Sequence, residues 1–447
     1  MENKRKRRQK RSSHKADSSI IAMAQRDESD RKAASMVRTV HQYFVFFAYL
    51  ATLVYLFSIP IEKAFEVEGI GTISRALGVP LLALWMIALL LNPMYLRAHK
   101  FFVATALFVI WIGLTRYWAI SPESSDFFLQ TYIQLFLSSL CIWLALTNEV
   151  KCRWAMQALL AGAWWAVVVI WYNYQTGNLT GGRATIESVD QNEISLVLAM
   201  CIVVAIYLIT EQRKSGRANP LMSLLNLAFI PAALLAILMT GSRGGTLACL
   251  PAFLFMLINF HRAGIGTKIV LGVLVVASTF FILQNLPEAQ IERISTTQEE
   301  LESGDIGGRG ELWRNAYELW SSDGETMVVG IGSGSFIAAS NYVAHNTHLS
   351  VLTETGLVGF FIYTAILTIL LLTIGRAGSG HVKLFLVSLL MSWAIGATAL
   401  TWEYRKPTWV VWTLILCVAV SSRKQAQSIV SAPVKKRKRR RPINDHY

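Results

Sequence analysis

Long apolar runs recur along most of this 447-residue chain, and they constrain its fold more than any other feature. Roughly 18 apolar residues in a row suffice for a helix to cross the core of a bilayer. A soluble helical protein is a poor alternative, because so many nearly uncharged runs would leave no polar face toward water. We therefore expect an all-α polytopic membrane protein of about 12 transmembrane helices. The expected spans are residues 40–61, 77–92, 101–118, 128–147, 155–174, 193–210, 221–240, 244–260, 267–284, 348–374, 382–400 and 408–421.

Lysines and arginines in the short loops indicate how the helices are oriented. If the N-terminus is cytoplasmic, the basic loops all fall inside, whereas several of the opposite loops are acidic. We therefore expect an inner-membrane protein with both termini in the cytoplasm and one large polar segment in the periplasm. The basic loops contain Arg97 and Lys100, Lys151 and Arg153, Arg213, Lys214 and Arg217, Arg262 and Lys268, and Arg376 and Lys383.

The chain divides into five parts on this basis. Basic cytoplasmic tails, which we expect to be disordered, form residues 1–39 and 422–447, because they hold few apolar residues. Residues 40–284 and 348–421 carry the transmembrane helices. Residues 285–347 form the large periplasmic loop, which we expect to be helical.

The two tails supply most of the formal net charge of +14. The cluster Lys435–Arg441 superficially resembles a nuclear signal or a nucleic-acid patch. Beside a membrane span, attraction to anionic lipid is the better interpretation, at about 1 kcal/mol per basic residue near the surface. We expect anionic membrane lipid, and no nucleic acid, as the partner of the tails.

Arg243 is the most informative single residue on the periplasmic side. It lies in Thr240-Gly241-Ser242-Arg243-Gly244-Gly245, a tight turn between two apolar runs. Small neighbours let the backbone approach a ligand, and a helix start favours an anion. A guanidinium can bind two phosphate oxygens at once. An arginine that reaches lipid headgroups from the end of a span is the alternative, but the glycines and Ser242 favour a phosphate site.

Three further arginines are candidates for the same site. Arg183 follows two glycines, so phosphate binding and simple solvation both remain open. Arg309 stands between glycines without a local acidic partner, and we expect it to be the second cation of the site. Arg314 has Glu311 and Glu318 one helical turn away, so a solvated helix pair is its default interpretation. The apolar stripe Trp313, Tyr317 and Trp320 on that helix favours packing on other helices over a platform for sugars.

His345 is the candidate base, because it sits where the polar segment re-enters the membrane and an imidazole takes up protons near neutral pH. Asn346 is placed to cap the following helix. His345 and His348 share one helix face, but no nearby carboxylate or cysteine completes a metal site. Glu354, two turns into the span, must be paired or solvated there. We expect neither a metal nor a cofactor.

These motifs resemble those of the O-antigen ligase and polymerase superfamily of bacterial membrane glycosyltransferases. The resemblance covers roughly residues 180–375. It rests on Ser242-Arg243-Gly244-Gly245, the Gly308-Arg309 to Trp313 stretch, Gly330-Ile331-Gly332, and His345-Asn346 followed by Gly356-Leu357-Val358-Gly359.

The resemblance implies a GT-C-like helical fold and a glycan donor linked to undecaprenyl diphosphate. It also implies transfer at the periplasmic face without nucleotide sugar or metal. In that chemistry Arg243 and Arg309, with Arg183, would neutralise the diphosphate leaving group, and His345 would deprotonate the acceptor hydroxyl. Ser242, Arg314, Asn346 and His348 would contribute to binding the diphosphate and the glycan.

Several functions remain open from the sequence. A ligase that attaches O-antigen to lipid A–core is the first, and a polymerase that extends an O-antigen or exopolysaccharide is the second. A protein-glycosylating branch is a third, because the motifs do not specify the acceptor. A transporter of anionic lipids or solutes belongs to a different class. It is less favoured, because transporters concentrate ionisable residues near the bilayer midplane, whereas here they cluster at the outer ends of the spans.

Overall fold

The computed structural model describes residues 31–32, 34–67, 69, 71–214, 219–260 and 309–431, together with positions 265, 269, 272, 273 and 280. Four sequence-based predictions therefore fall wholly or mostly outside the described residues. They concern the basic clusters Lys4–Arg11 and Lys435–Arg441, the expected span 267–284, and residues 285–308 of the polar loop.

Helices make up nearly all of the described structure, as the apolar runs predict. Two short strands, β1 (Glu66–Val67) and β2 (Gly71–Thr72), form one antiparallel hairpin. After the first helix, Ala34–Ile61, whose last turn is the 3-10 helix η1 (Ile59–Ile61), the helices are α2 (Ile73–Leu91), η2 (Pro93–Tyr95), α3 (Lys100–Thr115), α4 (Pro122–Ala145), α5 (Glu149–Gln175), α6 (Gln191–Lys214), α7 (Pro220–Met239), α8 (Arg243–Leu247), α9 (Leu250–Phe260), α12 (Gly310–Trp320), α13 (Gly324–Val329), α14 (Ser335–Ser340), α15 (Thr347–Gly375), α16 (Gly380–Ala397) and α17 (Lys406–Ser431).

Eight helices of the described residues are long and apolar enough to cross a membrane, judged by length and composition. They are the first helix, α2, α4, α5, α6, α7, α15 and α16. Two shorter apolar helices, Lys100–Thr115 and Arg243–Asn259, occupy positions where we expected spans. The protein is thus an all-α polytopic membrane protein, and the total of 12 spans stays a prediction.

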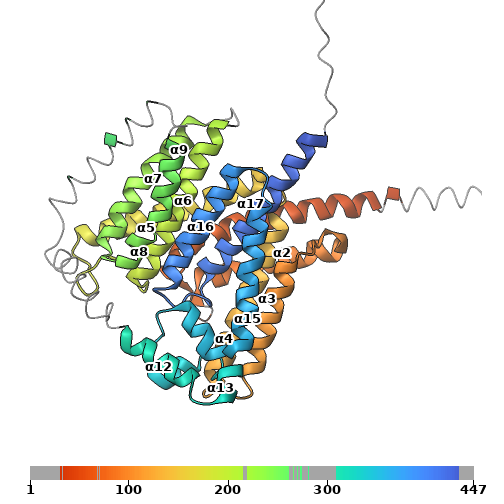
Figure 1. The fold of residues 1–447 in the computed structure, drawn as a ribbon. Coiled ribbons are helices and arrows are strands. Elements are labelled where there is room, and N and C mark those ends of the chain that lie inside the picture. Colours follow the sequence, from red (N-terminus) through yellow and green to blue (C-terminus); the bar gives the residue numbers. More distant parts are fainter. Residues whose placement is uncertain are drawn as a thin grey trace, which may run out of the picture.

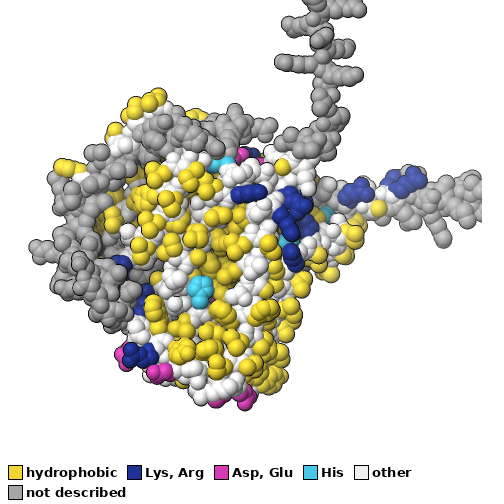
Figure 2. All heavy atoms as spheres, in the orientation of Figure 1, with side chains coloured by type: hydrophobic (Ala, Val, Ile, Leu, Met, Phe, Trp, Pro, Cys, Tyr) yellow, Lys and Arg dark blue, Asp and Glu magenta, His cyan; other side chains and the backbone are white. Residues whose placement is uncertain are grey.

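The long helices form one bundle, and the small helices α12 and α13 lie together at one end of it (Figure 1). Hydrophobic side chains cover the middle of the face seen in Figure 2, and charged side chains gather toward its margins. This is the distribution expected of a surface in contact with lipid. The connections before α2, α4, α6, α8, α15 and α17 all lie at the end of the bundle that carries α12 and α13, which we call the loop-side end.

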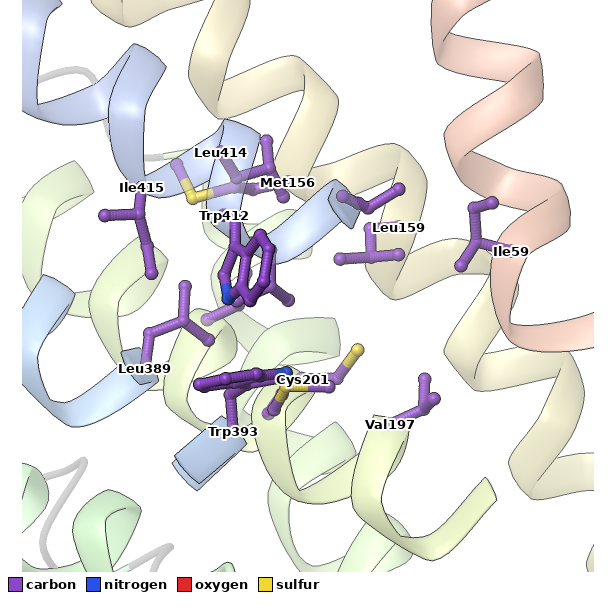
Figure 3. Close-up of a cluster of buried hydrophobic side chains, with 14 of the residues drawn as sticks. Ile59, Met156, Leu159, Val197, Cys201, Leu389, Trp393, Trp412, Leu414 and Ile415 are labelled. Carbon is purple, nitrogen blue, oxygen red and sulfur yellow. The ribbon is translucent and has the colours of Figure 1, made fainter. Parts of the chain in front are cut away.

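The bundle interior is a single large apolar core. Trp393 of α16 and Trp412 of α17 meet edge to face there, with ring centroids 5.2 Å apart (Figure 3). Met156 and Leu159 of α5 and Cys201 of α6 pack around them. Helices that are distant in sequence therefore hold one another in fixed positions, which makes the loop-side end a rigid platform.

A kink in α15 anchors the polar loop to this platform. Gly356 leaves helical geometry there (φ 63°, ψ −171°), which frees the carbonyls of the preceding turn. The turn Gly330–Gly334 covers them, as Ile331 N donates to Thr353 O and Gly332 N donates to Glu354 O, both at 3.0 Å. Gly330 also has a positive φ of 78°. The glycine-rich segment Gly330–Gly334 therefore binds directly to the kinked turn of α15.

Gly330 and Gly356 must both be glycine for this contact to form. A Cβ on Gly356 would overlap the backbone at Val328 and Gly330, and a Cβ on Gly330 would overlap the backbone at Glu354. Trp111 of α3 bonds the remaining carbonyl, that of Thr355, at 2.9 Å. One backbone contact therefore explains why both motifs contain glycine, at Gly330 and at Gly356.

Candidate active site

Ser242 and the glycines fix the backbone at Arg243. Ser242 caps α8, as its hydroxyl accepts a bond from Gly245 N at 3.2 Å. A Cβ on Gly245 would overlap Ser195 of α6, so glycine lets α8 pack directly against α6. The cap and this close packing place Arg243 at the first position of α8, at the loop-side end.

Arg183 holds the same turn from a different loop. Its Nε donates to Thr240 O at 2.6 Å, and its Nη2 donates to Asn192 Oδ1 at 3.2 Å. Ser242 Oγ donates to the same Asn192 oxygen at 2.9 Å. Arg183 and Ser242, both predicted to bind substrate, are therefore joined through Asn192, and these bonds orient the turn that carries Arg243.

Acidic residues at the start of α6 border this turn. Asp190 Oδ1 accepts bonds from Asn192 N and Glu193 N at 2.8 and 3.2 Å, which caps the helix. Glu193 forms ion pairs with Lys63 at 2.9 Å and Arg405 at 2.8 Å. One carboxylate thus connects the ends of the first helix, α6 and α17.

Arg309 lies within electrostatic reach of Arg243. Burial lowers the pKa of Arg309, the like charge of Arg243 lowers it further, and Asp190 opposes both effects. A guanidinium so far above neutrality stays charged. The two arginines that the sequence proposes as phosphate ligands therefore lie near each other, with one carboxylate nearby.

His345 belongs to the same group. Burial lowers its pKa below the usual 6.5, the charge of Arg309 lowers it further, and Asp190 and Glu193 raise it. The imidazole is consequently neutral at pH 7. Its Nδ1 is buried and has no hydrogen-bond partner among the described residues. Its backbone is in the left-handed region, with φ 48°, and such strain often marks a functional position.

Helix α12 holds Arg309 beside His345. Trp313 Nε1 donates to Ala344 O at 3.1 Å, and Thr353 Oγ1 of α15 donates to Ala316 O at 3.1 Å. Arg309 immediately precedes α12, so these two bonds set its distance from the start of α15. Trp313, the first residue of the predicted aromatic stripe, packs against protein, as expected.

Residues 227–364 match the family model described as O-antigen ligase. This segment of the chain is thus similar to the O-antigen ligase family. The matched segment contains Arg243, Arg309, His345 and both glycines of the α15 contact, whereas Arg183, Asp190 and Glu193 precede it. No curated protein matches the chain. The superfamily resemblance inferred from the motifs is thus confirmed.

Three further predicted site residues, Asn346, His348 and Arg314, also lie in the matched segment, but their contacts differ from those of His345 and Arg309. Asn346 caps α15, accepting from Leu349 N at 3.1 Å. His348 Nδ1 lies 3.1 Å from the hydroxyl of Tyr363, which belongs to the same helix, α15. Arg314 is exposed on α12, and no interaction recorded among the described residues joins it to Arg243, Arg309 or His345. Roles for these three residues in substrate binding stay predictions.

Glu354 is paired with backbone N–H groups. Its carboxylate accepts from Gly334 N at 2.8 Å and from Phe336 N at 3.4 Å. The residue is buried, and these bonds fasten the end of the Gly330–Gly334 turn to α15. The contacts of Glu354 are therefore structural.

Asp190, Glu193 and Arg405 complete the electrostatic environment, although no sequence motif predicts a role for them. Asp190 directly precedes α6 and Glu193 lies in its first turn, and this helix begins on the predicted periplasmic side, so the sequence did contain a signal for both residues. Arg405 offered no such signal, because only the fold brings it to Glu193. Among the described residues, no group of three or more His, Cys, Asp or Glu is placed to hold a metal ion.

Proposed function

We propose that this protein is a membrane glycosyltransferase that moves a glycan from undecaprenyl diphosphate to an acceptor hydroxyl at the periplasmic face. The observation that carries the proposal is the electrostatic grouping of Arg243, Arg309 and His345, which come from three separate segments. All three lie inside the part of the chain that matches the O-antigen ligase family.

The two arginines would bind and neutralise the diphosphate. Two like charges held close together in a half-buried place repel each other, and an anion between them removes that repulsion. Negative charge grows on the diphosphate as the glycosidic bond breaks, so preorganised guanidinium groups stabilise the transition state more than the ground state.

His345 would act as the general base. A neutral imidazole is needed for this role, and burial together with Arg309 keeps it neutral. The acceptor oxygen forms a bond to the anomeric carbon as its proton passes to His345. The bond from that carbon to the diphosphate oxygen breaks, and its electron pair leaves with the diphosphate. Attack opposite the leaving group inverts the anomeric configuration, without metal or nucleotide sugar.

The acceptor separates the two leading candidates. We place O-antigen ligase first, with lipid A–core as the acceptor, because the family match is described as O-antigen ligase. The alternative is a polymerase that uses a growing O-antigen or exopolysaccharide chain. In a deletion strain, lipid A–core without long glycan, with polymer accumulating on the carrier lipid, is the ligase outcome. A single repeat unit still joined to the core is the polymerase outcome.

Reconstitution tests the proposal directly. The purified protein in liposomes receives an undecaprenyl-diphosphate-linked glycan with either lipid A–core or a free O-antigen chain. We expect transfer to at least one acceptor and release of undecaprenyl diphosphate in equal amount. Absence of transfer to both acceptors, with intact donor recovered, would contradict a glycosyltransferase function.

A further inference from the structure

A cavity of about 440 Å³ lies beside the candidate active site. Its walls come from the end of the first helix, the β2 hairpin, α2, α4 and the start of α17. This volume falls within the roughly 300–1,000 Å³ of typical small-molecule sites. None of Arg243, Arg309 and His345 lines it.

The mouth of the cavity carries an excess of positive charge. Lys63, Arg75, Arg405 and Lys406 line it, and Glu62 is the one carboxylate among the lining residues. Lys406 binds Glu62 at 2.5 Å, while Lys63 and Arg405 share Glu193. Four cations against two carboxylates, Glu62 and Glu193, leave two positive charges.

Arg75 is the lining cation best placed to meet a ligand. Its Nε donates to the neutral amide of Gln134 at 3.2 Å, and it pairs with no carboxylate among the described residues. A guanidinium in this state retains donors for a second partner, and phosphate is a geometric match for it.

The deeper walls are apolar and open sideways. Val79 of α2 and Phe127 of α4 line the cavity and are 65% and 57% exposed, so its side opens between two helices that are candidate membrane spans. Tyr55 and Cys141 line it further from the loop-side end. A charged mouth above an apolar, laterally open wall suits an anionic amphiphile that enters from the bilayer.

Glu193 links this cavity to the candidate active site. It pairs with Lys63 and Arg405 of the cavity wall, and its charge also raises the pKa of His345. A ligand held by Lys63 and Arg405 would therefore be one carboxylate, Glu193, away from the group that acts on His345. A second substrate bound here would leave Arg243 and Arg309, which do not line the cavity, to the donor.

We propose that this cavity binds the acceptor, as a phosphate-bearing glycolipid whose headgroup contacts Arg75 and whose acyl chains lie between α2 and α4. This inference rests on the proposed function, which requires a second, hydroxyl-bearing substrate. It adds the place where that substrate enters and the chemistry that recognises it.

Two variants test the cavity by different means. Arg75→Gln removes the available cation. Gly78→Met fills the cavity, and it is sterically mild at Cβ because the nearest atom, in Tyr55, is 4.0 Å away. The matched control is Gly375→Met at the end of α15, where an added Cβ meets nothing within 4 Å and which does not line this cavity. The full-length proteins are placed in phosphatidylcholine nanodiscs.

Binding of lipid A, a diphosphorylated glycolipid, is titrated with and without saturating undecaprenyl diphosphate. We expect wild type and Gly375→Met to bind lipid A in both conditions, and both cavity variants to bind it about tenfold more weakly or worse. Affinity for undecaprenyl diphosphate should not change in either variant. If Gly78→Met fails to fold, Arg75→Gln alone decides.

Three outcomes would overturn the proposal. They are unchanged lipid A affinity in Arg75→Gln, weakened binding of undecaprenyl diphosphate instead of lipid A, and displacement of lipid A by an equal concentration of phosphatidylglycerol. The last two would assign the cavity to the donor or to bulk lipid. Because binding is measured without turnover, failure of the reconstituted transfer would refute the proposed function separately.

Discussion

The guanidinium of Arg309 lies close enough to that of Arg243 for the charge of Arg243 to lower its pKa. The two residues come from different segments, one at the start of α8 and one immediately before α12. Folding a protein so that two cations approach in a half-buried place costs free energy. An anionic ligand that binds both would recover that cost, and this is the basis of the proposed diphosphate site.

We expect Arg243→Ala and Arg309→Ala each to reduce transfer by about 10²–10³ in kcat, because each removes a preorganised charge from the leaving group. The protein should still insert in the membrane. Arg376→Ala is the matched control, since Arg376 is exposed at the C-terminal end of α15, away from the loop-side end, and we expect a loss well below tenfold. Initial rates in liposomes provide the measurement. Normal product from Arg243→Ala would refute the phosphate role of that residue.

His345→Ala should lower the single-turnover rate by about 10²–10⁴, the range typical of general base catalysis. Donor affinity should change little, because the imidazole acts on the acceptor proton. Rapid mixing of enzyme and donor with excess acceptor separates the two effects. An unchanged single-turnover rate would remove His345 from catalysis.

The rate should fall at acidic pH. The pKa of His345 lies below 6.5 in the folded protein, and the neutral form is the active one. Acceptor kcat/KM should therefore rise with pH, reach half its maximum below pH 6.5 and level off above that midpoint. Asp190 raises this pKa and Arg309 lowers it. Asp190→Asn, which retains a helix-capping side chain, should move the midpoint down, and Arg309→Gln should move it up. Shifts in the opposite directions would contradict the electrostatic grouping.

Arg183 and Asn192 should show coupled effects on the Arg243 turn. Both contribute to one hydrogen-bonded unit with Thr240 and Ser242. Residues in one network typically couple by about 0.5–3 kcal/mol. A double-mutant cycle with Arg183→Ala and Asn192→Ala, measured as kcat, should show this non-additivity. Strictly additive losses would mean that Arg183 acts independently of the turn.

Eight of the twelve expected spans correspond to described helices that are long and apolar enough to cross a membrane, because length and composition define such a helix. Helix ends were less predictable. Helix α4 starts at Pro122 rather than near 128, since its capped first turn contains polar residues such as Glu123 that a hydrophobicity criterion excludes. Arg243, Arg309 and His345 were singled out from motif composition, and their roles stay predictions. Arg405 and Asn192 were not, because their roles depend on contacts between distant segments.

Gly356→Ala and Gly330→Ala should both destabilise the protein. Each residue has a positive φ and leaves no room for a Cβ, and backbone strain alone costs about 1–3 kcal/mol. Gly375→Ala is the control, because it has space around it. Thermal unfolding of the detergent-solubilised proteins should give lower midpoints for the first two variants only. Equal midpoints for all three would refute the structural account of the α15 kink.

The most direct measurement is an experimental structure of the protein in a nanodisc with undecaprenyl diphosphate bound. We expect the diphosphate to lie within hydrogen-bond distance of both Arg243 and Arg309, with the His345 imidazole bordering the same space and the lipid chain in the periplasmic leaflet. A diphosphate bound elsewhere, or Arg243 and His345 found at opposite ends of the bundle, would contradict the account.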